Sequence, residues 1–320
     1  MKGMRTTGAR VVVTGGAGFI GSHTVELLVA AGAKVLVVDD HSHACGEQPP
    51  AEVETLAADC GSTEAASAIQ AFRPDAVLHL ASKGGVQKAA RDPGAHVKAS
   101  LASTVALFDA AVRAGARRVV TASSGGTIYG DAAKLPARET SAPAPLSAYG
   151  AAKRAEEVYL ATFGRRFGIR TVALRYGNVY GPRQDGTGEA GVVAITCNRL
   201  LSRDAPRVFG DGDQTRDFTY VGDIAAANVA ALFGTRSGEV NIGTARETRI
   251  NEIVARLVAE SSHSPATEFL PGREFEVRRV CLDVSRARAW FGWTPRVHVA
   301  EGLPLTWSWF ATRHRESVID

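Results

Sequence analysis

Short apolar runs alternate with longer amphipathic stretches over the first half of the chain. Runs at 10–13, 35–38, 53–57, 76–80, 118–121 and 170–174 have the length and composition of buried strands. Apolar residues recur at helical spacing over 19–31, 95–114 and 149–167, and a glycine follows each of these stretches. This alternation predicts βαβ units, and therefore an α/β fold with a doubly wound, Rossmann-like parallel sheet.

The regular alternation ends after Tyr176. Glycine, proline and charged residues become frequent at 181–186, and the apolar runs become shorter. We expect residues 1–175 to form the main domain, with roughly 210–245 returning to it. We expect 176–209 and 246–320 to form a smaller C-terminal α/β lobe that binds the substrate.

The composition is that of an ordinary globular protein, with 45% hydrophobic and 22% charged residues among 320. The 37 basic and 33 acidic residues are mixed along the chain, so a nucleic-acid partner is not expected. No apolar run approaches the ~18 residues of a membrane span, so we expect no membrane association. The four cysteines are scattered without a C-x-x-C pair, which predicts neither a metal site nor disulfides and favours a cytoplasmic location.

A glycine-rich turn follows the first predicted strand and opens the first helix. Gly15, Gly18 and Gly21 have the spacing G-x-x-G-x-x-G, which allows a pyrophosphate to approach backbone N–H groups at a helix N-terminus. Asp39 ends the second strand, where a carboxylate accepts hydrogen bonds from ribose hydroxyls and repels a 2′-phosphate. These features predict an NAD site in preference to an NADP site, the alternative being a purely structural turn. No Gly-Lys-Ser/Thr follows, so the turn is not an ATP- or GTP-binding phosphate loop.

Tyr149 and Lys153 are four residues apart, so they share one face of a predicted helix. A free phenol has a pKa near 10 and is a poor base at neutral pH. A neighbouring ammonium, together with the positive ring of an oxidised nicotinamide, favours the phenolate. The pair predicts a general base at Tyr149, the alternative being two surface residues without a role.

Several segments resemble the extended short-chain dehydrogenase/reductases. They are TGGAGFIGS at 14–22, the Tyr149/Lys153 pair, LRYGNVYGPRQ at 174–184, FGDGDQTRDFTYVGD at 209–223 and WFGWTP at 290–295. The resemblance covers nearly the whole chain and is closest to the NAD-dependent sugar epimerase/dehydratases of the UDP-glucose 4-epimerase group. It implies an isomerase that inverts C4 of a UDP-hexose through a 4-keto intermediate, with Tyr149 taking the proton of the C4 hydroxyl. It also implies a homodimer through the helices that begin near 95 and 149.

The resemblance also implies a set of binding residues. For NAD these are Gly15, Gly18, Phe19, Ile20, Gly21, Asp39, Asp59, Cys60, Leu80, Ala81, Lys83, Ser100, Tyr149, Lys153 and Tyr176. For the UDP-sugar they are Lys88, Ser124, Gly125, Tyr149, Asn178, Arg207, Val208, Phe209, Arg216, Arg273 and Val280. Asn178, Arg216 and Arg273 are expected at the diphosphate, 207–209 at the uracil and Val280 at the hexose. Ser100 stands where relatives usually carry Asn.

The segment SSGGTIYG, residues 123–130, departs from the family at the hydroxyl that holds the C4 oxygen. The Ser or Thr that relatives place four residues before the tyrosine of Tyr-Gly falls here at Gly125. We expect Ser124 to supply the hydroxyl, with Thr127 as the alternative. A third interpretation is that both hydroxyls only bond the backbone at a strand end.

Four other functions stay open from the sequence. Sugar 4,6-dehydratases place Asp-Glu where this chain has Gly126 and Thr127, which argues against dehydration. Lys83 or Lys88 facing the sugar would pair with a C6 carboxylate and favour UDP-glucuronate. The small side chain of Val280 would admit a 2-acetamido sugar such as UDP-N-acetylglucosamine. A non-catalytic NAD-binding sensor is the alternative from a different class.

Overall fold

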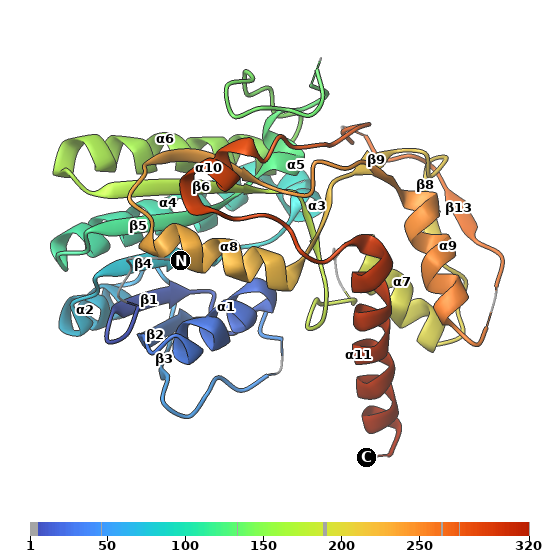
Figure 1. Ribbon diagram of the computed structural model, residues 1–320, viewed down its shortest axis with the longest axis horizontal. Helices are drawn as coiled ribbons and strands as arrows, with labels where there is room; N and C mark the ends of the chain where they lie inside the picture. The colour runs from blue at the N-terminus through green and yellow to red at the C-terminus, as the bar shows by residue number, and fades with distance from the viewer. Residues whose placement is uncertain are drawn as a thin grey trace.

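A seven-stranded parallel sheet forms the centre of the main domain (Figure 1). The computed structural model describes residues 6–45, 47–132, 134–187, 191–263, 265–274 and 276–319. In spatial order the strands are β11 (Gly238–Ile242), β6 (Arg170–Tyr176), β5 (Arg118–Ser124), β4 (Ala76–His79), β1 (Arg10–Thr14), β2 (Lys34–Asp39) and β3 (Glu54–Ala57). The predicted doubly wound parallel sheet is confirmed.

Helices cover both faces of this sheet (Figure 1), which explains why its strands are apolar without alternation. Val11 and Val13 of β1 pack on one face, against a layer that includes Leu28 and Ile224, and Val12 packs on the other, against a layer that includes Phe108. The first layer contains α1 (Phe19–Ala30), α8 (Val221–Phe233) and α10 (Ser285–Phe291). The second contains α2 (Thr63–Phe72), α4 (Pro93–Arg113) and α6 (Ala148–Phe167).

The smaller lobe, on the right in Figure 1, has its own apolar core. Its helices are α7 (Val192–Leu201), α9 (Ile250–Glu260) and α11 (Val299–Ile319). Three short strand pairs complete it: β7 (Asn178–Tyr180) with β10 (Phe218–Tyr220), β9 (Thr215–Arg216) with β12 (Thr248–Arg249), and β8 (Arg207–Phe209) with β13 (Glu268–Leu270).

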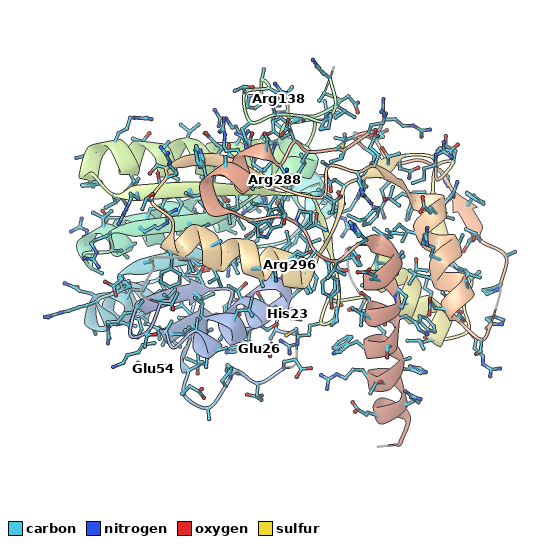
Figure 2. The ribbon with its side chains drawn as sticks, viewed as in Figure 1. His23, Glu26, Glu54, Arg138, Arg288 and Arg296 are labelled. Atoms are coloured by element: carbon cyan, nitrogen blue, oxygen red, sulfur yellow. The ribbon has the colours of Figure 1, made fainter. Side chains whose placement is uncertain are left out.

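The two parts of the chain are interleaved. Within 210–245, α8 and β11 join the main domain, whereas β9 and β10 pair in the smaller lobe. From 246–320, Ala287 and Trp293 pack in the core of the main domain. His23 and Glu26 on α1 (Figure 2) contact the loop after β7: the His23 ring donates to the Pro182 carbonyl at 3.0 Å, and Glu26 pairs with Arg183 at 2.6 Å.

Two further short helices, α3 (Val86–Arg91) and α5 (Gly125–Ile128), lie at the carboxyl ends of β4 and β5. The sequence did not predict them, nor α2. Within the described part of the chain, no helix combines the length and apolar character that crossing a membrane requires. The cysteines at 45, 60, 197 and 281 are free thiols.

Candidate active site

The first cavity, of about 660 Å³, lies at the carboxyl ends of β1, β2 and β4 and at the N-terminus of α1. This is the edge of an open α/β sheet at which ligands bind. Most of the residues predicted to bind NAD line it. They are Gly15, Gly18, Phe19, Ile20, Gly21, Asp39, Asp59, Cys60, Leu80, Ala81, Lys83 and Tyr149.

The glycine-rich turn leaves no room for a side chain at Gly15 or Gly21. Gly15 has φ +70°, and a Cβ there would lie 2.6 Å from the backbone nitrogen of Ala81. A Cβ on Gly21 would lie 2.0 Å from the carbonyl oxygen of Gly15. Within the described residues no side chain caps the N-terminus of α1 at Gly18, so its first N–H groups are available to an anion. The turn therefore fits the pyrophosphate of a dinucleotide.

Asp39 is 8% exposed and lines the same cavity. Its carboxylate accepts hydrogen bonds from the backbone N–H of Ala17 at 2.9 Å and of His41 at 2.8 Å. These two bonds fix the carboxylate at the end of β2. Because a carboxylate has about four lone-pair sites, it retains capacity for the hydroxyls of a ribose.

Lys83 bridges two carboxylates on this cavity. Its ammonium contacts Asp40 and lies 2.7 Å from Asp59. Burial opposes ionisation of Asp59, but the hydrogen bonds from Lys83, the Gly61 N–H and Ser103, together with the charge of Lys83, hold the pKa of Asp59 below its usual value. Lys83 and Lys88 both line the first cavity, so neither lies where it was expected to face a C6 carboxylate of the sugar.

The second cavity, of about 410 Å³, lies between the main domain and the smaller lobe. Ser124, Thr127, Tyr149, Asn178, Arg216 and Arg273, all predicted substrate or catalytic residues, line it. Arg216 is 9% exposed and pairs with Glu276 at 2.6 Å. The guanidinium of Arg273 lies 3.9 Å from the ring centroid of Phe209. Two arginines thus reach the region in which a diphosphate was predicted.

Tyr149 lines both cavities. It lies in the first turn of α6, where the side chain of Ser147 caps the helix by accepting from the backbone N–H of Gly150 at 3.1 Å. Lys153, one turn on, is 4% exposed, and its ammonium is 6.0 Å from the centroid of the Tyr149 ring. The predicted pair therefore shares one buried face of α6.

Lys153 alone does not lower the pKa of Tyr149 below that of a free phenol. Burial raises the pKa of Tyr149 above its usual value, and the charge of Lys153 offsets only part of this effect. Glu156, which accepts a hydrogen bond from Lys153 at 2.9 Å, pushes the pKa of Tyr149 further upward. A favoured phenolate therefore requires a further positive charge, as in the expectation that Lys153 acts together with an oxidised nicotinamide.

The hydroxyl groups of Ser123, Ser124 and Thr127 have different environments. Ser123 donates to Glu157 at 2.7 Å and is structural. Ser124 lines the second cavity, as does Thr127, whose Oγ1 is buried without a hydrogen-bond partner among the described residues. A Cβ on Gly125 would lie 2.6 Å from a methyl carbon of Leu282, so a serine there would require repacking. Ser124 and Thr127 therefore both remain candidates for the hydroxyl that holds the C4 oxygen.

Other predicted site residues lie outside the linings of both cavities. Ser100 donates to Glu156 at 3.3 Å, and Tyr176 donates to Asn228 at 2.5 Å. Val208 and Val280 are 1% and 4% exposed, and Arg207 pairs with Glu268 at 2.7 Å. Gly125 and Lys153 are likewise absent from both linings. Glu156 was not predicted, although its i+3 spacing from Lys153 was visible in the sequence.

Comparison with known proteins agrees with this geometry. The family model for the NAD dependent epimerase/dehydratase family matches residues 11–243. The UDP-glucose 4-epimerase of Mycolicibacterium smegmatis is 37% identical over 310 residues, covering 95% of this chain and 99% of that protein. The chain belongs to the NAD-dependent epimerase/dehydratase family, and NAD is its cofactor.

Two solved structures resemble the fold over almost its full length. The UDP-glucose 4-epimerase of Thermotoga maritima with UDP-glucose has a TM-score of 0.91 and 37% identity, covering 97% of this chain and 99% of that one. The Thermus thermophilus UDP-glucose 4-epimerase with NAD has a TM-score of 0.88 and 38% identity, covering 94% and 98%. The resemblance predicted from the motifs, with UDP-glucose 4-epimerases foremost, is confirmed.

Proposed function

We propose that the protein catalyses the reversible inversion of C4 of a UDP-hexose, interconverting UDP-glucose and UDP-galactose through a 4-keto intermediate. The observation that carries the proposal is the position of Tyr149, which lines both the cavity with the glycine turn and the cavity with the two arginines. One phenol oxygen can thus serve a dinucleotide on one side and a sugar hydroxyl on the other.

Each residue group has a separate task in this proposal. Bound NAD supplies the hydride acceptor for C4. Tyr149 takes the proton of the C4 hydroxyl and later returns it, while Ser124 or Thr127 holds the C4 oxygen. Arg216 and Arg273 bind the diphosphate, remote from the reacting carbon. Tight binding of the diphosphate holds the substrate while leaving the hexose free to turn and present its other face.

The lining of the second cavity favours a neutral hexose over its alternatives. The charged residues described along it are Arg216, Arg273, Glu274 and Glu276. Among the described residues that line this cavity there is no lysine to pair with the C6 carboxylate of UDP-glucuronate, and we assign its two arginines to the diphosphate. Gly126 and Thr127 supply no acid or base for the loss of water, which argues against a dehydratase. Buried Val280 gives no support to a selection for a 2-acetamido sugar.

Incubation of the purified protein with UDP-glucose, with product analysis by proton NMR, tests the proposal. We expect UDP-galactose to accumulate without release of free NADH. UDP-glucuronate and UDP-N-acetylglucosamine are tested in parallel. Turnover of UDP-glucuronate alone would contradict the proposed substrate, and NAD binding without turnover of any nucleotide sugar would favour the non-catalytic sensor.

We also propose a homodimer formed through α4 and α6. These helices pack against each other and leave apolar side chains at the surface, with Val97, Val158 and Tyr159 43%, 49% and 44% exposed. Sedimentation equilibrium tests this, and Val158→Glu should shift the protein toward monomers. A wild-type protein that sediments as a monomer would refute the dimer. The cytoplasmic location stays a prediction.

A further inference from the structure

Three buried polar side chains near Tyr149, those of Ser100, Lys153 and Glu156, are linked by hydrogen bonds. The hydroxyl of Ser100 on α4 donates to Oε1 of Glu156 at 3.3 Å, and the ammonium of Lys153 donates to Oε2 at 2.9 Å. Ser100, Glu156 and Lys153 are 5%, 1% and 4% exposed. Both oxygens of the Glu156 carboxylate are thus engaged, one of them by the ammonium expected to act on the phenol.

The other ionisable side chains near Lys153 and Glu156 carry little charge of their own. His79 on β4 is buried, and burial followed by the Lys153 charge lowers its pKa to about 3. His96 on α4, whose ring centroid is 6.1 Å from that of Tyr149, has its pKa lowered by the same two causes, so both imidazoles are neutral at neutral pH. Burial raises the pKa of Cys60 to about 12, which keeps its thiol protonated.

Two charges therefore act on Tyr149 from within its own helix, and they have opposite signs. Charged groups farther off are screened in part: Asp59 pairs with Lys83, which lies on the first cavity. Lys88 on α3 also lines that cavity and acts on His96. A buried carboxylate held at 2.9 Å from Lys153 cancels much of the potential that the ammonium would otherwise exert on the phenol.

We propose that Glu156 is a positioning residue of the active site, which fixes the ammonium of Lys153 and sets the pH at which Tyr149 releases its proton. The Lys153–Glu156 ion pair has almost no net charge, and the phenol stays protonated until a further positive charge arrives. Base strength at Tyr149 is thereby tied to occupation of the first cavity by an oxidised nicotinamide. This role in catalysis rests on the proposed function, whereas the effect on the phenol does not.

The test compares neutral and charged replacements of Glu156. Glu156→Gln and Glu156→Met remove the charge with little change in size, and Glu156→Asp retains it. Tyrosine labelled with carbon-13 at Cζ reports ionisation by NMR, and Tyr149→Phe assigns the signal among the six tyrosines. Spectra are recorded with and without added NAD, and circular dichroism verifies that each variant is folded.

We expect both neutral variants to raise the phenolate-to-phenol ratio of Tyr149 about tenfold at a given pH, equivalent to a shift of about one unit. The acid limb of the kcat profile should move to lower pH by the same amount, whereas Glu156→Asp should remain near wild type. If Glu156→Gln does not fold, Glu156→Met serves as the neutral variant. An unchanged or lowered ratio in the folded neutral variants would overturn the inference. A wild-type protein without epimerase activity would instead refute the proposed function and leave the NMR comparison decisive for Glu156.

Discussion

Replacing Glu157 should destabilise the protein more than any other single carboxylate change on α6. Glu157 and Arg175 form a bidentate ion pair with contacts of 2.8 and 2.7 Å, and both side chains are 1% exposed. Glu157 also accepts from Ser123 at 2.7 Å and from Arg154 at 2.8 Å. These contacts join α6 to β6 at Arg175 and to β5 at Ser123, the residue before Ser124.

The cost follows from what Glu157→Ala leaves behind. Arg175 would remain buried with Tyr129 as its main side-chain partner, at 2.8 Å. Removing one partner of a buried ion pair costs about 3–5 kcal/mol, because the other charge loses its compensation. Glu157→Gln keeps one acceptor and should cost about 1.5–3 kcal/mol, the value of a hydrogen bond to a charged group.

Acidification should reduce the difference in unfolding free energy between the wild-type and Glu157→Ala proteins. Burial opposes ionisation of Glu157, but the hydrogen bonds and charge of Arg175, together with the hydrogen bonds from Ser123 and Arg154, outweigh burial and hold the pKa of Glu157 below the usual 4.5. Its contribution to stability is therefore fully present above that value and is lost as the pH falls through the lowered pKa of the folded state. The wild-type and Glu157→Ala proteins should converge over that acidic window.

Equilibrium unfolding in urea at a series of pH values measures both effects. Glu252→Ala is the matched control, because Glu252 pairs with Arg256 at 3.0 Å while both side chains are about half exposed, at 48% and 47%. That change should cost under ~1 kcal/mol. A cost of the same size for Glu157→Ala, or a difference that does not shrink on acidification, would refute the reasoning.

Three other changes test the two cavities. Asp39→Ala should weaken NAD binding about tenfold, measured by calorimetry, because a charge-assisted acceptor is lost; unchanged affinity would place the ribose elsewhere. Gly15→Ala should abolish NAD binding and lower the urea midpoint, since its Cβ would meet backbone at 2.6 Å with φ +70°; a normal NAD affinity would contradict the turn's role. Thr127→Val should leave the stability unchanged or raise it, because the Oγ1 of Thr127 has no partner among the described residues. The kcat values of Thr127→Val and Ser124→Ala are then compared. The variant that lacks the hydroxyl holding the C4 oxygen should lose about tenfold or more in kcat.

The sequence sufficed where a local pattern determines the structure. The valines at 11–13 are buried on both faces of the sheet, and Gly15 in the turn has a φ that other residues rarely adopt, so β1 and the first cavity could be predicted. The i, i+4 spacing of Tyr149 and Lys153 likewise placed both on one face of α6.

The contacts between distant segments could not be predicted. Lys83 is bound by Asp40 and Asp59, which come from the ends of two other strands, so its direction depends on the assembled sheet. Glu156 meets Ser100 across 56 residues of sequence, and its i+3 spacing from Lys153 alone does not show that its carboxylate is buried. The pKa of Tyr149 also depends on burial, which outweighs the neighbouring charge that the sequence displays.

The Tyr149→Phe protein provides the most direct test of the central claim. The variant keeps the ring and removes only the hydroxyl, so NAD affinity should stay within about threefold of wild type. Interconversion of UDP-glucose and UDP-galactose should fall by at least ~10³-fold, because the group that moves the C4 proton is absent. Turnover equal to that of the wild-type protein would contradict the account.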